Sequence, residues 1–306
     1  MNTITLGGKL EVPQIGLGCM RVLGLSKTEM EAYYHTSMEL GINFFDHADI
    51  YGDGECESHF ADSIGMTPAL REKITLQIKC SIIPGVGYDF SKEHILASVD
   101  GCLKRLKTDY ADILLLHRPD ALVEPEEVTE VFERLEKSGR VKYFGVSNQS
   151  ASQIALLSRY LKKDTIIANQ MQLSIAYCPM IDFGLNTNTL KPEAIDRDNG
   201  TLDYCRLNNI TIQAWSPFLF GCFEGVFIGH EKFPELNRKL DEIAEKYAAT
   251  PTAVAVAWIS RHPAKIQTIV GTTNAGRLRE IAESCNFTLT REEWYALYMA
   301  AGKSLP

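Results

Sequence analysis

Eight short apolar runs recur along the chain, and this recurrence constrains the fold more than any other feature. Within each run the hydrophobic residues are continuous, which is typical of strands covered on both faces, as in a parallel sheet. Each run is followed by a segment with helical character. We therefore expect eight parallel strands at Gln14–Gly18, Ile42–Phe45, Ile74–Lys79, Ala111–Leu116, Val141–Val146, Thr165–Gln170, Ile210–Trp215 and Ile266–Val270.

The segments between the runs carry the start and stop signals of helices. Capping-box patterns begin at Ser26, Ser150 and Thr290. Thr250 precedes a proline at a first helical position, and Glu124–Gly139 combines an apolar face with a closing glycine. Strand and helix therefore alternate from end to end.

This alternation predicts a closed (β/α)₈ TIM barrel with parallel strands. A doubly wound sheet is the alternative, and it should show Gly-x-Gly-x-x-Gly after its first strand. Here Gly16-Leu17-Gly18 is followed by Cys19-Met20-Arg21, so that pattern is incomplete. Because a barrel of ~250 residues forms one domain and no linker divides the chain, we expect residues 1–306 to be a single domain.

Three segments decorate the repeat. Thr3–Val12, with Gly7-Gly8 at its centre, is typical of a two-residue β-hairpin before the first strand. Long loops are expected at Met171–Gly200 and Ser216–Phe233. In a barrel these loops lie on the face that carries the active site, where long loops are usually functional.

Composition and charge argue against several classes of protein. Acidic residues outnumber basic ones by 39 to 31, and no dense Lys/Arg cluster occurs, which is unlike a nucleic-acid binder. No apolar run reaches the ~18 residues of a membrane helix, and the first residues do not resemble a signal peptide. The eight cysteines are scattered without metal or redox spacing. We expect a soluble cytoplasmic protein without a metal site.

Ionisable side chains stand where three of the predicted strands end. Asp46 directly follows the second run and Tyr51 comes five residues later, Lys79 ends the third run, and His117 follows the fourth. Each alone has an ordinary interpretation, as a helix cap, a rim residue, a snorkelling lysine or a core histidine. Together they favour an active site, in which Asp46 is the partner of an otherwise costly buried lysine.

These four side chains together could donate a proton. A tyrosine has an ordinary pKa of ~10, and an adjacent ammonium is expected to lower it. The carboxylate would hold the ammonium, and the histidine would orient a carbonyl oxygen. With no metal motif or nucleophile in the pattern, protonation of an oxyanion formed by hydride transfer fits best.

Longer motifs around these residues resemble the aldo-keto reductase family. They are Gly41-Ile42-Asn43-Phe44-Phe45-Asp46-x-Ala48-x-x-Tyr51-Gly52, the Lys79-ended strand, Leu114–Asp120, Gly139–Asn148, Asn169-Gln170, Trp215-Ser216-Pro217 and Val270–Asn274, in family order. The resemblance implies a (β/α)₈ barrel that reduces aldehydes and ketones with NADPH. Tyr51 would be the general acid of a catalytic tetrad completed by Asp46, Lys79 and His117.

The resemblance also implies a set of cofactor-binding positions. Ser147, Asn148 and Gln170 would hold the nicotinamide carboxamide, and Trp215 stands where an aromatic residue, more often tyrosine, stacks on the nicotinamide. Others match the loop over the pyrophosphate or the segment that binds adenosine. The implied set is Met20, Arg21, Asp46, Ser147, Asn148, Gln170, Trp215, Ser216, Leu219, Gly221, Gly271, Thr272, Asn274, Arg277 and Glu280.

The adenosine-binding segment departs in part from the family pattern. A frequent basic residue near Gly271 is missing, and Ile281 stands where asparagine is common. Arg277 could pair with a 2′-phosphate, or it could be an exposed helix arginine. We expect NADP(H) as the cofactor in preference to NAD(H).

The substrate is expected to be a small carbonyl compound bound by Tyr51, His117 and Arg118. Arg118 would place a cation at the mouth, where aromatic residues are common in the family. Met20, His47 and the two long loops are expected to complete the pocket. The sequence does not define the oligomeric state, and a monomer is consistent with it.

Two other function classes remain as alternatives. A dinucleotide-binding regulatory or sensor barrel, like the relatives attached to potassium channels, would show little turnover, but all four tetrad residues are present here. A metal-dependent hydrolase would need clustered His and Asp ligands at strand ends. Only His117 and Asp46 qualify, and Lys79 would compete with a cation.

Overall fold

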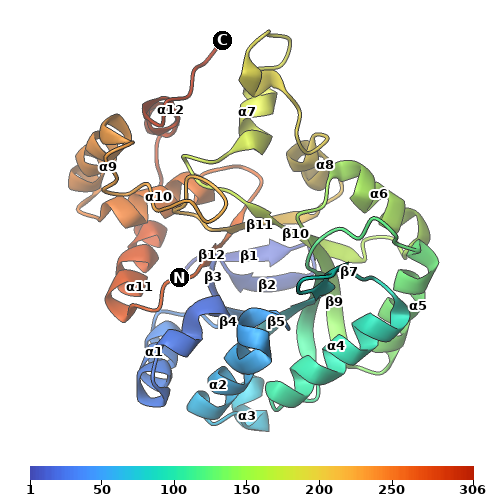
Figure 1. The fold of residues 1–306 in the computed structure, drawn as a ribbon. Coiled ribbons are helices and arrows are strands. Elements are labelled where there is room, and N and C mark those ends of the chain that lie inside the picture. The colour runs from blue at the N-terminus through green and yellow to red at the C-terminus, as the bar shows by residue number, and fades with distance from the viewer.

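The computed structural model describes residues 1–306, whose parallel strands close into a ring (Figure 1). Around the ring the strands follow the order β10-β11-β12-β3-β4-β5-β8-β9. They are β3 (Ile15–Gly18), β4 (Phe44–Asp46), β5 (Thr75–Cys80), β8 (Ala111–Leu116), β9 (Val141–Ser147), β10 (Ile166–Gln172), β11 (Thr211–Trp215) and β12 (Gln267–Val270). All eight predicted runs form barrel strands, which confirms the TIM barrel and excludes the doubly wound sheet.

Helices surround the ring (Figure 1). The capping boxes predicted at Ser26, Ser150 and Thr290 are all present, and the Thr250 hydroxyl accepts a hydrogen bond from the Ala253 amide. The helices are α1 (Lys27–Glu39), α2 (Glu55–Ile64), α3 (Pro68–Arg71), α4 (Lys92–Arg105), α5 (Pro125–Lys137), α6 (Ala151–Tyr160), α7 (Pro179–Leu185), α8 (Thr201–Leu207), α9 (Pro234–Tyr247), α10 (Pro251–Ser260), α11 (Ala275–Ala282) and α12 (Arg291–Ala300).

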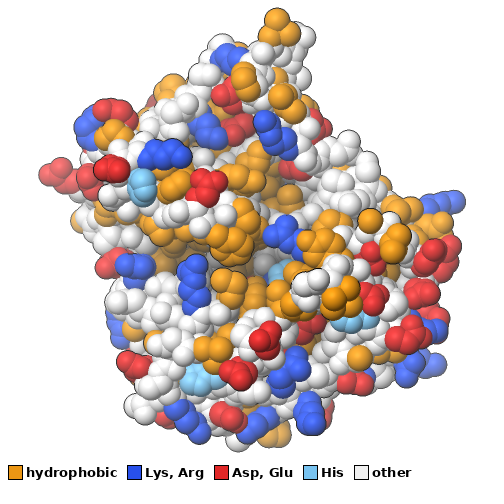
Figure 2. Space-filling view, in the orientation of Figure 1, with side chains coloured by type: hydrophobic (Ala, Val, Ile, Leu, Met, Phe, Trp, Pro, Cys, Tyr) orange, Lys and Arg blue, Asp and Glu red, His pale blue; other side chains and the backbone are white.

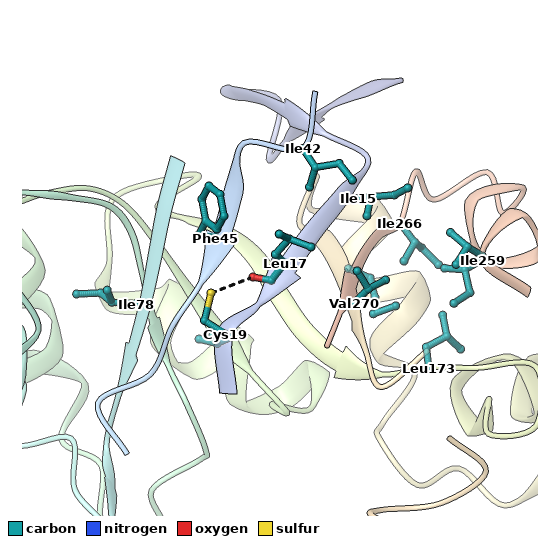
Figure 3. Packing of buried hydrophobic residues seen from close by; sticks show 14 of the residues in the cluster. Ile15, Leu17, Cys19, Ile42, Phe45, Ile78, Leu173, Ile259, Ile266 and Val270 are labelled. Carbon is teal, nitrogen blue, oxygen red and sulfur yellow. Dashed lines mark hydrogen bonds between the residues drawn. The ribbon is translucent and has the colours of Figure 1, made fainter. Parts of the chain in front are cut away.

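The hydrophobic core lies mainly between the strands and the helices. Its cluster contains 65 buried residues, whereas a second cluster, formed by the barrel interior and the amino-terminal hairpin, contains nine. Figure 3 shows part of the larger cluster, in which Ile15 of β3 lies near Ile266 and Ile259 of α10. Because one face of each strand packs on helices and the other on the barrel interior, the strand sequences are mainly apolar.

A hairpin closes the amino-terminal end of the barrel. Strands β1 (Thr3–Leu6) and β2 (Leu10–Pro13) are antiparallel. The nine-residue interior cluster joins them to the barrel strands, and its members are Ile4, Leu6, Val12, Phe44, Ile113, Leu115, Ile167, Ala168 and Ile269.

The hairpin connection has three residues, so the prediction of a two-residue loop is wrong. Leu6 pairs with Leu10, which leaves Gly7, Gly8 and Lys9 in the turn. Gly7 and Gly8 both have positive φ, 55° and 69°. A side chain at Gly7 would begin 2.6 Å from Cβ of Ile167, so this turn needs glycine for both backbone conformation and close approach.

Strand alternation directs the predicted catalytic side chains towards the barrel axis. Ile113 and Leu115 of β8 belong to the interior cluster, and His117 follows two residues later. On β4, Phe44 is interior, and Asp46 lies two residues further on. Because side chains two apart share a face, Asp46 and His117 point inward at the carboxyl end of the barrel.

The two predicted long loops differ in structure. Met171–Gly200 contains the end of β10, the helix α7 and a short 3₁₀ helix at Pro192–Ala194, so the prediction of a plain loop is wrong there. Ser216–Phe233 lacks regular helix, and an antiparallel bridge between Leu219 and Val226 folds it back on itself. A small hairpin of β6 (Ile82–Ile83) and β7 (Gly87–Tyr88) follows β5.

None of the helices combines the length and the apolar character needed to cross a membrane.

His47 is a core residue, although the sequence suggested that it lines the pocket. It is fully buried, its ring packs edge-on against Phe60 with centroids 4.8 Å apart, and neither ring nitrogen has a hydrogen-bond partner. Burial, together with the Lys79 cation, lowers the pKa of His47 to about 3. The imidazole is therefore neutral in the folded protein at all moderate pH values.

This buried imidazole links stability to pH. In the unfolded chain a histidine titrates near ~6.5, so its contribution is complete above that pH and is lost as pH falls towards the folded pKa. We expect His47→Leu to reduce the loss of unfolding free energy between about pH 6.5 and about pH 5 by about 2 kcal/mol. Urea titrations of both proteins measure this, and an identical pH dependence in the variant would contradict the assignment.

Candidate active site

Asp46, Lys79 and Tyr51 meet at the carboxyl end of the barrel. The Lys79 ammonium donates to Asp46 Oδ2 at 2.7 Å and to Tyr51 Oη at 3.0 Å. It also donates to the His47 carbonyl at 3.3 Å, so all three of its protons have acceptors. Three elements supply this group: β4 carries Asp46, β5 carries Lys79, and the short 3₁₀ helix Tyr51–Gly54 after β4 carries Tyr51.

The Lys79 side chain is completely buried, and its charge is retained. Burial alone opposes the ammonium form, but Asp46 and Tyr51 together raise the pKa of Lys79 above its ordinary value. The ion pair expected between Lys79 and Asp46 therefore exists, with Asp46 only 2 % exposed. A buried cation of this kind requires a close anion and satisfied hydrogen bonds.

The pKa of Tyr51 does not fall as the sequence suggested. Burial raises it above its ordinary value, and the Lys79 ammonium only opposes part of that rise. The lysine lowers the pKa as predicted, but desolvation of the phenol, which the sequence did not reveal, outweighs it. Tyr51 thus holds its proton at neutral pH, which suits a proton donor.

His117 lies beside Tyr51, with ring centroids 6.0 Å apart in an edge-to-face arrangement. Burial, the Lys79 cation and Arg118 hold the pKa of His117 well below its ordinary value. The imidazole is therefore neutral and can donate one N–H without bringing a charge. Its Nδ1 is buried without a partner, whereas the ring also lines the cavity described below.

The second oxygen of Asp46 is held by two glutamines, of which Gln77 was not predicted to belong to the site. Gln77 Nε2 donates to Asp46 Oδ1 at 2.6 Å, and Gln170 Nε2 donates to the same atom at 3.3 Å. Gln170 was expected only to bind cofactor. Asp46 is therefore fixed on one side by Lys79 and on the other by these two amides.

A glutamine network continues from Asp46 across the barrel. Gln213 Nε2 donates to Gln77 Oε1 at 3.0 Å and to Gln267 Oε1 at 2.8 Å, while Gln213 Oε1 accepts from Gln170 at 3.2 Å. Gln267 donates to the Pro13 carbonyl at 2.9 Å. In register, Gln170, Gln213 and Gln267 are direct neighbours on β10, β11 and β12. The signal was present in the sequence as single glutamines within apolar strand runs.

A cavity of about 380 Å³ opens above the tetrad, on the face where Figure 2 shows a hollow with hydrophobic walls. A volume of this size is within the range of small-molecule sites. Most predicted binding positions line it, namely Met20, Arg21, Asp46, Tyr51, His117, Arg118, Ser147, Asn148, Gln170, Trp215, Ser216, Leu219, Gly271, Thr272 and Arg277.

Four predicted residues lie outside the cavity lining. Lys79 lies beneath it, in contact with Tyr51. The Gly221 carbonyl accepts a hydrogen bond from Gln172 Nε2, which connects the loop Ser216–Phe233 to β10. Asn274 uses its side chain to cap α11, and Glu280 lies on the same helix. No residue of Met171–Gly200 reaches the cavity, so the expectation that this loop lines the pocket is wrong.

Two strand ends at the cavity adopt a left-handed backbone conformation. Asn148, after β9, has φ of 55°, and Ser216, after β11, has φ of 51°. Hydrogen bonds link the two strand ends: Trp215 Nε1 donates to Asn148 Oδ1 at 3.1 Å, and Asn148 Nδ2 donates to Ser147 Oγ at 2.8 Å. Such conformations cost energy and persist only where surrounding contacts enforce them. Here they hold polar groups and an indole at the cavity wall.

The donor set of the cavity does not match a metal. No group of three or more His, Cys, Asp or Glu side chains is placed to hold a metal ion. Instead, the cavity combines amides, hydroxyls, an indole and three arginines with a single carboxylate, that of Asp46.

Comparison with known proteins identifies the family. The aldo/keto reductase family model matches residues 14–300. An uncharacterized oxidoreductase, YcsN of Bacillus subtilis, is 35% identical over the full length of both chains. A 6-dehydroglucose reductase of Agrobacterium fabrum is 33% identical, also over the full length of both.

A solved structure agrees with the fold. The Klebsiella pneumoniae aldo/keto reductase in complex with NADP and acetate superposes with a TM-score of 0.78 at 22% identity, covering 99% of this chain and 96% of that one. The family match covers nearly all of the barrel and the tetrad positions within it. The chain is a member of the aldo/keto reductase family.

Proposed function

We propose that the protein, with residues 1–306 acting as one domain, reduces aldehydes or ketones to alcohols with NADPH, and that Tyr51 is the general acid. The observation that carries this proposal is the contact of the Lys79 ammonium with both Asp46 and Tyr51 at the floor of the cavity. In a family member, this arrangement provides a protonated phenol, in contact with a cation, beside the position that a substrate carbonyl oxygen would take.

The hydrogen-bond directions support Tyr51 as the proton donor. Lys79 donates to Tyr51 Oη, so the phenolic proton is free to point into the cavity. Tyr51 gives this proton to the developing alkoxide, and the Lys79 ammonium stabilises the phenolate that remains. Neutral His117 orients the carbonyl oxygen by donating an N–H.

The residues around the tetrad fit a nicotinamide dinucleotide. Gln170 lines the cavity and its Oε1 accepts no hydrogen bond within the protein, so it can accept from a carboxamide. Ser147 and Asn148 lie beside it, Trp215 offers a ring face, and Ser216 and Leu219 would cover the pyrophosphate. When bound, NADPH supplies the hydride.

Two arginines support NADP over NAD. Arg21 follows β3 and Arg277 lies on α11, and both line the cavity near Gly271. Arg21 Nη1 lies 3.8 Å from the position that a side chain at Gly271 would take. We assign Gly271, Thr272, Asn274 and Glu280 to the same end of the cofactor. The presence of NADP in the Klebsiella complex agrees with this choice.

Tyr51→Phe tests the general acid. It removes the donated proton, so we expect NADPH oxidation with an activated aromatic aldehyde to fall by at least ~100-fold, the low end for general acid catalysis. NADPH affinity, measured by protein fluorescence, should be retained. Tyr247→Phe is the control, because that phenol bonds to Glu293 and the Thr288 carbonyl, outside the cavity. Full activity in Tyr51→Phe would refute the assignment, and binding without turnover in the wild type would favour a sensor.

Gln213→Met tests the glutamine network, because Gln213 touches neither Asp46 nor the cavity. It removes the hydrogen bonds that orient Gln77 and Gln170, and we expect kcat to fall ~10-fold with a displaced pH profile. KM for NADPH should change far less.

Thr268→Val is the matched control, since Thr268 is buried on β12 and its hydroxyl has no partner. A lower unfolding temperature in Gln213→Met with an unchanged pH profile would reduce the network to a structural role.

Arg277→Met tests the cofactor preference. Loss of a charge-assisted contact with a 2′-phosphate should raise KM for NADPH by ~10-fold or more and leave KM for NADH nearly constant. Arg279→Met is the control, because Arg279 lies on the same helix and pairs with Glu39 at 3.7 Å. Equal changes for both cofactors would remove Arg277 from phosphate recognition.

A further inference from the structure

Arg118 is a cation in the cavity without an anionic partner. It is half-buried and lines the cavity directly after His117. None of the ion pairs of the protein includes Arg118, so no carboxylate oxygen lies within 4.0 Å of its guanidinium nitrogens. The one carboxylate of the cavity, that of Asp46, is already paired with Lys79.

The ring of strands separates Arg118 from the two arginines assigned to the cofactor. Arg277 comes after β12 and Arg21 after β3, whereas Arg118 comes after β8. In the order β10-β11-β12-β3-β4-β5-β8-β9, strands β8 and β12 are four positions apart in a ring of eight. The backbone of Arg118 is therefore across the barrel mouth from β12, and it directly follows His117, whose ring contacts Tyr51.

Nearby side chains orient Arg118 towards the interior of the mouth. Its guanidinium carbon lies 5.9 Å from the ring centroid of Trp215, in a cation–π arrangement. Its backbone amide donates to Ser81 Oγ at 3.4 Å, and Ser81 Oγ also accepts from the His117 amide at 3.1 Å. The residue is thus held between β5 and β8, with the cation leaning towards β11.

Apolar side chains also line the cavity, from the loops after β4, β5 and β11. They are Ile50, Ile82, Phe218, Phe223 and Val226. A guanidinium beside such walls is partly desolvated, and an anion placed there gains a strong charge-assisted hydrogen bond, bidentate in the best case. The chemistry therefore matches an organic acid with an apolar body.

We propose that the substrate is an anionic carbonyl compound, an oxo acid whose carboxylate is bound by Arg118 while its carbonyl lies at Tyr51 and His117. This inference deepens the proposed reductase function and depends on it. The apolar side chains of the cavity lining would contact the carbon chain between the two groups.

Matched substrates separate the charge from the carbonyl. The pairs are glyoxylate, succinic semialdehyde and 4-carboxybenzaldehyde, each against its methyl ester, with NADPH oxidation as the readout. For the pair whose spacing fits the site, we expect kcat/KM of the acid to exceed that of the ester by at least ~10-fold, the value of a hydrogen bond to a charged group. The ratio should fall as salt is added.

Variants assign the preference to Arg118. Arg118→Met should lower the acid-to-ester ratio by ~10-fold or more, and Arg118→Lys should restore part of it, because a lysine keeps the charge but not the bidentate fork. Arg277→Met is the control, since it should raise KM for NADPH without changing the ratio.

The outcomes distinguish the two proposals. Equal turnover of acids and esters, or a ratio unaffected in Arg118→Met, overturns the anionic substrate and leaves the reductase function standing. Absence of turnover for every aldehyde in the presence of NADPH overturns the proposed function itself.

Discussion

The buried contact between Lys79 and Asp46 is the constraint on which the active end of the barrel depends. A fully buried ammonium is stable only with a close carboxylate and with acceptors for all its protons. The chain meets this demand by carrying the two groups on the adjacent parallel strands β5 and β4, so that their inward-facing positions meet at one end of the barrel. Tyr51 then enters as the third acceptor, which brings its phenol to the cavity. Loss of Asp46 would leave the Lys79 charge buried and unpaired, which would reduce the free energy of unfolding as well as the activity.

The glutamine network extends that constraint into the barrel interior. TIM barrels commonly fill this space with branched aliphatic side chains, yet here four strands contribute amides at one level. A buried amide is costly unless its donors and acceptors are used, and the observed bonds use both protons of Gln213 and run without a break from Asp46 to the Pro13 carbonyl. Because the amides have direction, the network specifies one orientation of Asp46. An aliphatic layer would pack as well but would leave that carboxylate freer to turn.

The sequence predicted the barrel because strands covered on both faces have mainly apolar runs, and it predicted the site because ionisable residues stand at the carboxyl ends of three of those runs. These residues are Asp46, Lys79 and His117. Other features depend on three-dimensional surroundings that local patterns do not encode. Gln213 has no neighbour in sequence that indicates an interior network, and His47 follows Asp46 but points to Phe60. The pKa of Tyr51 depends on the balance between burial and one ammonium, and only the assembled structure provides both quantities.

The net charge of the protein is negative, whereas the charge of the cavity is positive. The barrel topology explains how one chain can have both. The chain carries a formal charge of −8, while the cavity presents three arginines and one carboxylate that is already neutralised by Lys79. Acidic residues at exposed positions of the surrounding helices contribute to the total but not to the cavity, because solvent and salt screen them. The arginines follow strand ends on opposite sides of the ring, so two separate anions can be attracted to one cavity without competing for the same cation. Tyr51, the proposed proton donor, lies at the floor of that cavity, in the position where a molecule held from one side and a cofactor held from the other would meet.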